Sequence, residues 1–180
     1  MKDCFEKLLI SKEDIAKRIK EVAEQINKDY EGESLLLVGI LKGSVLFFSD
    51  LIREIEVPVS MDFMAISSYG SGTTSSGEVK MIKDLDKTIE GKNVLIVEDI
   101  IDSGNTLSYL KRLLLSRNPK SLKLCTLLDK PDRRTADITV DYCCFSIPDE
   151  FVVGYGLDYD ELYRGEKDIY ILSPKVYMNK

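Results

Sequence analysis

The most constraining feature of the sequence is an aliphatic run that leads through two acids into a polar loop and a helical pattern. Residues 94–97 read Val-Leu-Ile-Val, which is typical of a strand buried on both faces of a parallel sheet. Glu98 and Asp99 follow directly, and Asp-Ser-Gly-Asn-Thr at 102–106 precedes leucines at helical spacing. This order predicts a phosphate site, because the first N–H groups of a helix have no intrahelical partner and its dipole favours an anion.

The side chains of the same stretch predict a second ligand group beside the phosphate. Ser103 and Thr106 add hydroxyl donors to the phosphate site. Glu98 and Asp99 suit a hydrated divalent metal or the vicinal hydroxyls of a ribose. A phosphate site next to a sugar or metal site indicates a phosphorylated sugar as the ligand.

Two other interpretations of this stretch are weaker. An ordinary strand–turn–helix with an acidic surface turn would have to tolerate the repulsion among Glu98, Asp99 and Asp102. The first strand of a phosphoacceptor receiver domain has a similar aliphatic run with acids. Such a domain would begin near residue 94, however, and it has no role for Ser-Gly-Asn-Thr.

Composition and charge narrow the possible functions. A chain of 180 residues with 44% hydrophobic and 31% charged residues fits one globular domain. The net charge of −6 argues against broad binding of nucleic acid. The N-terminus lacks a signal-peptide pattern and no apolar run is long enough for a membrane span, so we expect no membrane partner and a cytoplasmic location. The four cysteines show no paired spacing, and we expect reduced thiols.

The chain contains no histidine, which restricts its possible chemistry. Any proton transfer must use a carboxylate, Lys, Tyr or Cys, because imidazole is not available. Any divalent metal is expected to have oxygen ligands, which suits Mg²⁺.

Strand and helix patterns alternate along the chain. Ser11 is a predicted N-cap for a helix that ends near Gly32, and a second helix is expected at 45–55. Predicted strands cover residues 34–40, 59–66, 79–82, 93–98, 122–128, 140–145, 151–155 and 169–172. The alternation predicts an α/β fold with a doubly wound, mainly parallel twisted sheet flanked by helices, and active loops at the carboxyl ends of its strands.

Two polar loops follow predicted strands. Lys42 supplies a cation and Gly43 permits close backbone approach to a ligand, although a solvated charge and a plain turn glycine explain this pair equally well. Residues 67–78 are small and polar, and they predict a mobile lid that carries Ser68 and Tyr69. An antiparallel connection without function is the alternative for the lid.

Two later segments are also candidates. Lys130 lies at a strand end and is expected to contact a ligand, whereas Arg133 and Arg134 are expected in a solvated turn. Phe151 precedes small residues and the isolated acid Asp158, so it suits an aromatic plate on which a planar base stacks, with a core role as the alternative.

The pattern of two acids, Ile-Ile and Asp-Ser-Gly-x-Thr resembles the 5-phosphoribosyl-1-diphosphate (PRPP) signature of type I phosphoribosyltransferases. With Leu-Lys-Gly-Ser at 41–44, Ser-Tyr-Gly at 68–70 and Phe-Val-Val-Gly-Tyr-Gly-Leu-Asp-Tyr at 151–159, it is similar to the bacterial hypoxanthine-guanine branch of that family. The resemblance runs from about residue 10 to residue 172. It implies Mg²⁺-dependent transfer of 5-phosphoribosyl from PRPP to N9 of hypoxanthine or guanine.

The resemblance also implies roles for the phosphate-binding residues. The 5′-phosphate would lie on the loop formed by Asp102, Ser103, Gly104, Asn105 and Thr106. The pyrophosphate would meet Lys42, Gly43 and Arg164, and the Leu41–Lys42 peptide would be cis.

Roles for the sugar, metal and purine follow in the same way. Glu98 and Asp99 would engage the ribose hydroxyls and one Mg²⁺, and Asp158 a second Mg²⁺ beside the base. Phe151 would stack on the purine and the backbone of Val152 would hydrogen-bond its edge. Lys130 would select a 6-oxo acceptor over a 6-amino donor, since an ammonium only donates. Asp102 is expected to be the general base that accepts the purine N7 proton.

The expected organisation is a single domain over residues 1–180. Its core would span about residues 10–146, and a small hood would combine about 1–9 with 147–180. A homodimer or homotetramer is expected by analogy. The competing function is a regulator of the same fold that binds RNA and senses nucleotides, and the acidic composition speaks against it.

Overall fold

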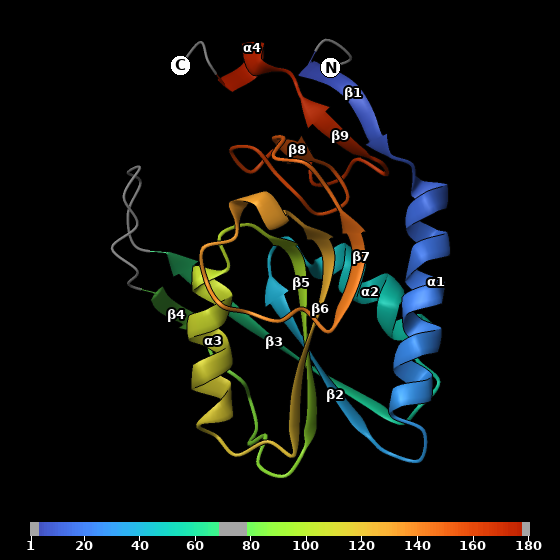
Figure 1. Cartoon of the computed structure of the whole chain (residues 1–180), viewed down its shortest axis with the longest axis vertical. Helices are drawn as coiled ribbons and strands as arrows, with labels where there is room; N and C mark the ends of the chain where they lie inside the picture. The colour runs from blue at the N-terminus through green and yellow to red at the C-terminus, as the bar shows by residue number, and fades with distance from the viewer. Residues whose placement is uncertain (1–3, 69–78, 178–180) are drawn as a thin grey trace.

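The computed structural model describes residues 4–68 and 79–177, and two sheets organise these residues (Figure 1). The larger sheet contains β2 (Leu35–Leu41), β3 (Val59–Ser68), β4 (Val79–Lys83), β5 (Asn93–Ile101), β6 (Ser121–Asp129) and β7 (Tyr142–Ser146). The smaller sheet contains β1 (Phe5–Ile10), β8 (Val152–Val153) and β9 (Ile169–Leu172). The helices are α1 (Lys12–Asp29), α2 (Val45–Glu54), α3 (Asn105–Leu115), the 3₁₀ turn η2 (Pro131–Arg133) and α4 (Pro174–Tyr177).

The larger sheet has the strand order β4-β3-β2-β5-β6-β7 and is parallel except for the β3–β4 pair. The chain first adds β3 on one side of β2 and later adds β5 on the other side. The point between β2 and β5 is therefore a topological switch, which is where open α/β sheets place their ligands. The predicted doubly wound, mainly parallel sheet is confirmed.

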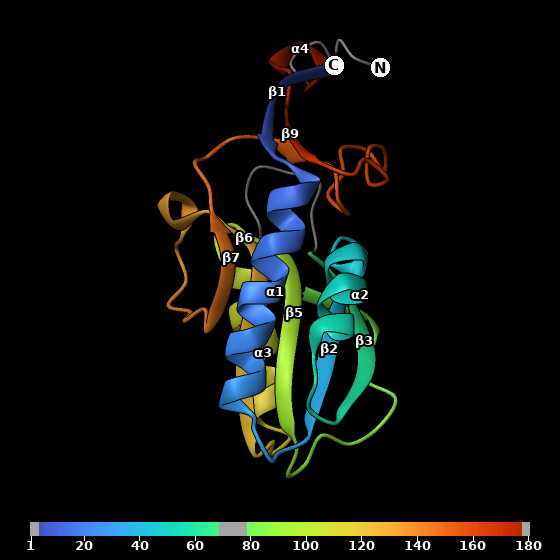
Figure 2. The same ribbon diagram turned by 90° about the vertical axis from the view of Figure 1, so that its right-hand side faces the viewer.

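Helices cover both faces of this sheet. Figure 2 shows α1 and α2 in front of the sheet and α3 behind it. The α1 helix begins as predicted, because the Ser11 hydroxyl accepts a hydrogen bond from the backbone N–H of Asp14. Each face buries its own apolar cluster, one centred on α1 and α2 and the other on α3. None of the described helices has the length and apolar character that crossing a membrane requires.

The smaller sheet lies beyond the carboxyl ends of β2 and β5 (Figure 1), and we call this sheet together with the whole segment 147–177, which carries β8 and β9, the hood. Its buried residues Ile10, Val152 and Ile169 belong to the same apolar cluster as the α1 face of the main sheet. The predicted strand 151–155 is shorter than expected, since Gly154 and Tyr155 both have positive φ and turn the chain away.

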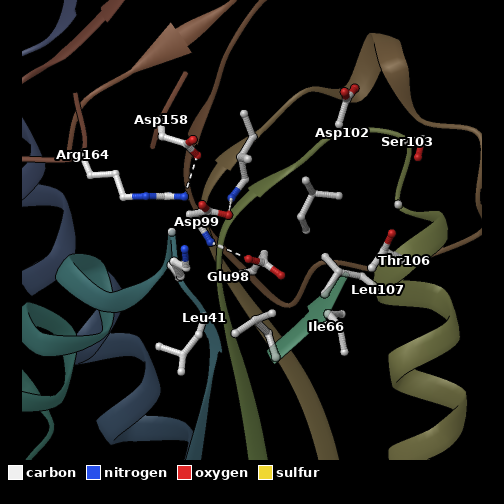
Figure 3. A pocket seen from close by; sticks show the side chains of 16 residues that line it. Leu41, Ile66, Glu98, Asp99, Asp102, Ser103, Thr106, Leu107, Asp158 and Arg164 are labelled. Atoms are coloured by element: carbon white, nitrogen blue, oxygen red, sulfur yellow. Dashed lines mark hydrogen bonds and ion pairs between the residues drawn. The ribbon is translucent and has the colours of Figure 1, made fainter. Parts of the chain in front are cut away.

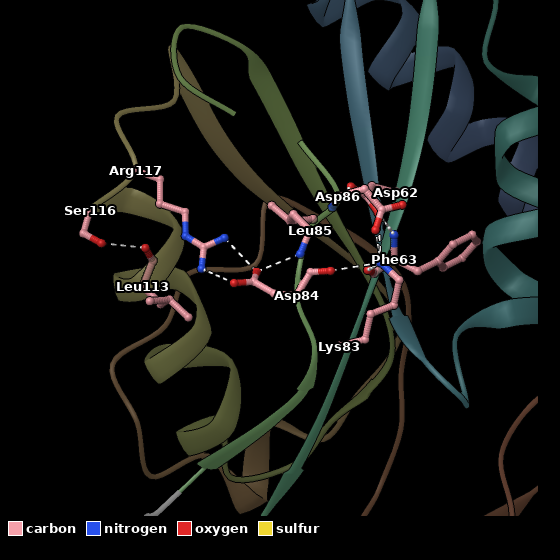
Figure 4. Close-up of polar contacts among 9 residues, drawn as sticks. All are labelled: Asp62, Phe63, Lys83, Asp84, Leu85, Asp86, Leu113, Ser116 and Arg117. Carbon is pink, nitrogen blue, oxygen red and sulfur yellow. Dashed lines mark hydrogen bonds and ion pairs between the residues drawn. The ribbon is translucent and has the colours of Figure 1, made fainter. Parts of the chain in front are cut away.

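The stem of the predicted lid is the antiparallel β3–β4 pair. Ser68 ends β3, whereas Tyr69 and the rest of the lid to residue 78 lie outside the described residues. Lys83 of β4 donates hydrogen bonds to the carboxylate of Asp62 (3.4 Å) and the carbonyl of Phe63 (2.9 Å) on β3 (Figure 4). This contact joins β4 to β3 at the end of the strand pair that is farther from the lid.

Asp62 accepts further hydrogen bonds that keep it ionised. Burial alone would raise the pKa of Asp62, but N–H donors from Asp86 and Phe63 and the Lys83 ammonium outweigh burial and lower it. The residue after β4, Asp84, is also held in place. Its two carboxylate oxygens accept hydrogen bonds of 2.7 Å from the guanidinium of Arg117, which follows α3 (Figure 4).

Candidate active site

The candidate site lies where β2 and β5 stop pairing. The β2–β5 register ends at Gly39 and Val97, whereas β5 continues to pair with β6 as far as Ile101. The last part of β5 therefore lies beside an open cavity of about 340 Å³ rather than beside a strand. Figure 3 shows Asp158 and Arg164 on one side of this cavity and Ser103 and Thr106 on the other.

Glu98 and Asp99 lie on this last part of β5, which pairs with β6 but not with β2, so the strand continues three residues beyond its predicted end at residue 98. Glu98 is only 9% exposed, and its carboxylate accepts one hydrogen bond, from the N–H of Asp99 (3.1 Å). Burial first, and the charge of Asp99 second, raise the pKa of Glu98 well above its ordinary value. Burial also raises the pKa of Asp99. The pair is a concentration of negative charge that a bound cation or hydroxyl donors would stabilise.

The loop after β2 brings its backbone against these acids. The Leu41–Lys42 peptide is cis, as the family resemblance implied. A β-carbon on Gly43 would lie 1.5 Å from Oδ2 of Asp99, and one on Gly156 would lie 2.0 Å from the carbonyl oxygen of Gly43. Glycine is therefore required at position 43 by the close approach of Asp99, and at position 156 by the close approach of the loop backbone.

The predicted phosphate loop leads from β5 into α3. Gly104 is the N-cap of α3 with φ of 80°, and Asp102, Ser103, Gly104 and Thr106 line the cavity. The carbonyl of Ser103 accepts hydrogen bonds from the N–H groups of Thr135 and Ala136, both at 3.0 Å. These bonds tie the loop to the segment that follows η2.

Asn105 is the one residue of this loop that does not line the cavity. Its side chain lies beside Thr135, whose hydroxyl is 3.5 Å from its carbonyl oxygen, and it borders a separate groove behind α3. Its N–H lies 3.4 Å from the Ser103 hydroxyl, which accepts from it. Any contribution of Asn105 to a phosphate would thus come from its backbone.

The turn after β6 is more than a solvated charge run, and this corrects the expectation for Arg134. The Arg134 side chain is only 18% exposed, forms an ion pair with Asp129 and donates from Nε to the carbonyl of Asp102 (3.2 Å). Arg133 remains exposed, but its guanidinium contacts Asp102 (3.1 Å) and Asp149 (3.6 Å). Both arginines therefore position the phosphate loop. The sequence signal was weak, because charge runs after strands are usually solvated.

A second cavity of about 230 Å³ adjoins the first beneath the hood. Lys130 is 8% exposed there and lies 3.7 Å from Asp149, and Val152 and Leu157 supply apolar wall. The two cavities share the lining residues Asp99, Ile100, Asp102 and Asp158. A ligand in one cavity would therefore meet a ligand in the other above these residues.

Phe151 borders the second cavity and is 40% exposed, which excludes the core role that was its alternative. Its ring stacks on that of Tyr177 in α4 with centroids 5.3 Å apart and forms a T-shaped pair with the ring of Tyr159 at 5.6 Å. The hood thus presents a small aromatic group at the mouth of this cavity.

Cationic side chains border the first cavity on its hood side. Arg164 donates to the carbonyl of Gly156 (2.8 Å) and forms an ion pair with Asp158 (2.9 Å). Lys42 forms an ion pair with Glu161 (3.1 Å), which also lies 3.4 Å from Arg164. Glu161 was not among the residues expected from the sequence, and it faces Lys42 only because the hood folds over the sheet.

The donor set of the site fits Mg²⁺. Its acids provide only hard oxygen ligands, and the raised pKa values of Glu98 and Asp99 mark negative charge that is poorly neutralised. The described part of the chain holds no group of three or more acids, cysteines or histidines arranged to bind a metal. A Mg²⁺ ion would then use one or two carboxylates and complete its shell with water and substrate oxygens, which is its usual behaviour in proteins.

Comparison with known proteins shows the family to which the chain belongs. Residues 9–160 match the family described as phosphoribosyl transferase domain. The chain is 54% identical over 177 residues to the hypoxanthine-guanine phosphoribosyltransferase of Bacillus subtilis, with 98% of both chains covered. It is 55% identical over 176 residues to that of Mycobacterium bovis, with 94% of this chain and 87% of the other covered.

Solved structures agree with these sequence comparisons. A crystal structure of a hypoxanthine phosphoribosyltransferase from Staphylococcus aureus is 54% identical and matches with a TM-score of 0.95, covering 98% of this chain and 96% of the other. The chain belongs to the phosphoribosyltransferase family, in its hypoxanthine-guanine branch. The family resemblance inferred from the motifs is thereby confirmed.

Proposed function

We propose that the protein transfers the 5-phosphoribosyl group from PRPP to N9 of hypoxanthine or guanine, giving IMP or GMP and pyrophosphate, as a step of purine salvage. The observation that carries this proposal is the pair of cavities that share Asp99, Asp102 and Asp158. One cavity offers a helix N-terminus to a phosphosugar, and the other offers an aromatic ring and a buried ammonium to a planar base.

Within this proposal the phosphosugar occupies the first cavity along its length. The loop from Asp102 to Thr106 binds the 5′-phosphate through its N–H groups and hydroxyls. Lys42, Gly43 and Arg164 bind the pyrophosphate at the opposite side. Cleavage of the bond to pyrophosphate places negative charge on the leaving group, and these two cations stabilise it.

The two acids of β5 are placed to stabilise the positive charge that develops on the ribose when the bond to pyrophosphate breaks. Glu98 and Asp99 bind the ribose hydroxyls and tolerate the positive charge that develops on the ribose. Glu98 and Asp99 would hold one Mg²⁺ and Asp158 a second, and the bound metal would neutralise charge on the phosphate oxygens. Ser68 and Tyr69 belong to the lid, whose closure would exclude water from the activated sugar.

The purine occupies the second cavity. Phe151 stacks on its ring, the backbone of Val152 hydrogen-bonds its edge and Lys130 donates to the 6-oxo group. A 6-amino group would place a donor against a donor, so adenine is rejected. Asp102 lines both cavities and accepts the proton from N7 as the new bond forms.

The direct test is a panel of bases incubated with the purified protein, PRPP and Mg²⁺. We expect nucleotide and pyrophosphate from hypoxanthine and guanine and none from adenine or orotate. A protein that binds PRPP and nucleotides but forms no product with any base would contradict the enzyme assignment and favour the nucleotide-sensing regulator. Omission of Mg²⁺ in a parallel series tests the metal requirement.

We also propose a single-domain protomer that works in the cytoplasm as a homodimer or homotetramer. The four cysteines are free, which is compatible with a reducing compartment. Light scattering of the purified protein measures the oligomeric state, and a monomer at micromolar concentration would contradict that part.

A further inference from the structure

Glu161 contacts both cationic side chains that the proposed function assigns to pyrophosphate. Its Oε2 atom lies 3.1 Å from Nζ of Lys42 and 3.4 Å from Nη2 of Arg164. Lys42 belongs to the loop after β2, whereas Arg164 and Glu161 belong to the hood. One carboxylate oxygen therefore bridges two cations that belong to different segments of the chain.

The backbone of the hood holds Glu161 in this position. Its N–H donates to Oδ2 of Asp158 (2.9 Å), and the neighbouring residues Tyr159 and Leu162 exchange backbone hydrogen bonds of 3.2 and 3.0 Å. Glu161 has φ of +64°, in the left-handed region. A tight turn thus presents the carboxylate to Lys42.

The charge and exposure of the group suit a contact that exchanges readily. Hydrogen bonding to Lys42, and then the Lys42 charge, lower the pKa of Glu161, so the carboxylate is ionised at neutral pH. The side chains of Lys42 and Glu161 are 68% and 64% exposed, so neither is held by burial. An incoming diphosphate carries more charge than one carboxylate and would take both cations.

We propose that Glu161 is an internal competitor for pyrophosphate, whose carboxylate holds Lys42 and Arg164 in the ligand-free enzyme and must leave them when the diphosphate group binds. This inference rests on the proposed function, in which Lys42 and Arg164 meet pyrophosphate. Its consequence is weaker binding of pyrophosphate and faster loss of that product, because the carboxylate replaces it on the two cations.

The experiment measures the affinity for inorganic pyrophosphate by titration calorimetry at fixed Mg²⁺. Glu161→Gln removes the competing charge, and we expect pyrophosphate to bind about 2- to 5-fold more tightly, the range that an exposed ion pair produces. The affinity for GMP, which has no diphosphate, should stay unchanged. Equal or weaker pyrophosphate binding by Glu161→Gln would overturn the inference.

Two further variants separate contact from simple charge. Glu161→Asp keeps the charge but shortens the side chain, which breaks the contact with Lys42 and Arg164. Its affinity for pyrophosphate should therefore be close to that of Glu161→Gln. Wild-type affinity for pyrophosphate in Glu161→Asp would overturn the inference. In a Lys42→Met background, the effect of Glu161→Gln should shrink, because one of the two cations is gone. An undiminished effect would mean that Glu161 acts only through its field, which also overturns the inference.

A separate measurement, the formation of GMP by the wild type, tests the proposed function. Formation of GMP from guanine and PRPP by the wild type supports that function whatever the Glu161 variants show. A wild type that forms no GMP and binds no pyrophosphate contradicts the function and the inference together.

Discussion

Gly43 and Asp99 pack so closely that a β-carbon on Gly43 would lie 1.5 Å from Oδ2 of Asp99. The contact joins the loop after β2 to the last part of β5, and it places the Lys42–Gly43 backbone directly beside the acids. A methyl group at Gly43 must therefore displace either the loop or the carboxylate.

We predict that Gly43→Ala lowers kcat/KM for PRPP by about 10²-fold, the effect of a misplacement near 1 Å in a catalytic site. Initial rates at varied PRPP concentration measure it. Gly165→Ala is the matched control, because a β-carbon there meets nothing within 4 Å. Wild-type PRPP kinetics in Gly43→Ala would show that the close packing has no catalytic importance.

Asp102 carries the prediction for proton transfer. Asp102→Asn keeps the size of the side chain but cannot accept a proton as a carboxylate does, so kcat should fall by roughly 10²–10⁴-fold with little change in PRPP binding. Single-turnover rates and PRPP titration separate the two quantities. Asp132→Asn, one charge change on the exposed η2 turn, is the control.

The ion pair between Asp102 and Arg133 (3.1 Å) adds a second way to read the Asp102→Asn result. If kcat is largely retained while the PRPP affinity falls, Asp102 orients the phosphate loop through Arg133 and does not accept the proton. That result would move the assignment of the base elsewhere.

Much of the fold could be predicted because the strands of a parallel sheet are continuous apolar runs. Strands β2, β3, β5 and β6 were located within three residues at each end, since Leu, Val and Ile leave little alternative at those positions. Among the hood strands, β9 was predicted at its observed bounds and β8 lies within a longer predicted strand, whereas β1 was not predicted. Residues 5–10 pair only with β9 and through irregular register, so no clear alternation marks them.

Site residues could be predicted where they lie close together in the sequence, but not where their role depends on contacts between distant segments. The acids and the phosphate loop occupy one stretch, 98–106, whose order indicates their use. Glu161 lies 119 positions from Lys42, and no pattern in either segment indicates that they meet. The burial of Arg134 against Asp129 likewise depends on how a turn folds back.

Lys130 is predicted to set specificity for the base. Lys130→Ala should raise the KM for guanine and hypoxanthine by about 10-fold or more, since the 6-oxo group loses a charged hydrogen-bond donor, while the KM for PRPP changes little. Steady-state kinetics with each substrate varied in turn measure this split. Lys92→Ala, an exposed lysine at the opposite end of β5, is the control. Unchanged purine kinetics would make Lys130 a structural partner of Asp149 only.

Glu98 gives a prediction for stability and pH. Its folded-state pKa lies above the value in the unfolded chain, because burial disfavours the charged form. The folded protein then binds more protons than the unfolded one between the two pKa values, so this group lowers stability as pH rises through that window. Near pH 4, just below the ordinary pKa of a glutamate, Glu98 is mostly protonated in both states and the penalty is small.

Glu98→Gln removes the charge while keeping the shape, so the ligand-free variant should be more stable than the wild type by about 1–3 kcal/mol at pH 8. This corresponds to a melting temperature several degrees higher, at about 2–4 °C for each kcal/mol. The difference should shrink toward zero near pH 4, and Glu90→Gln, an exposed change, should show none at any pH. Thermal melts from pH 4 to pH 8.5 measure the two curves. If the melting temperatures of the wild type and Glu98→Gln differ by the same amount at every pH, burial of the Glu98 charge does not destabilise the protein. If Glu98→Gln is more stable but binds PRPP more weakly, the site keeps a destabilising charge because the ligand needs it.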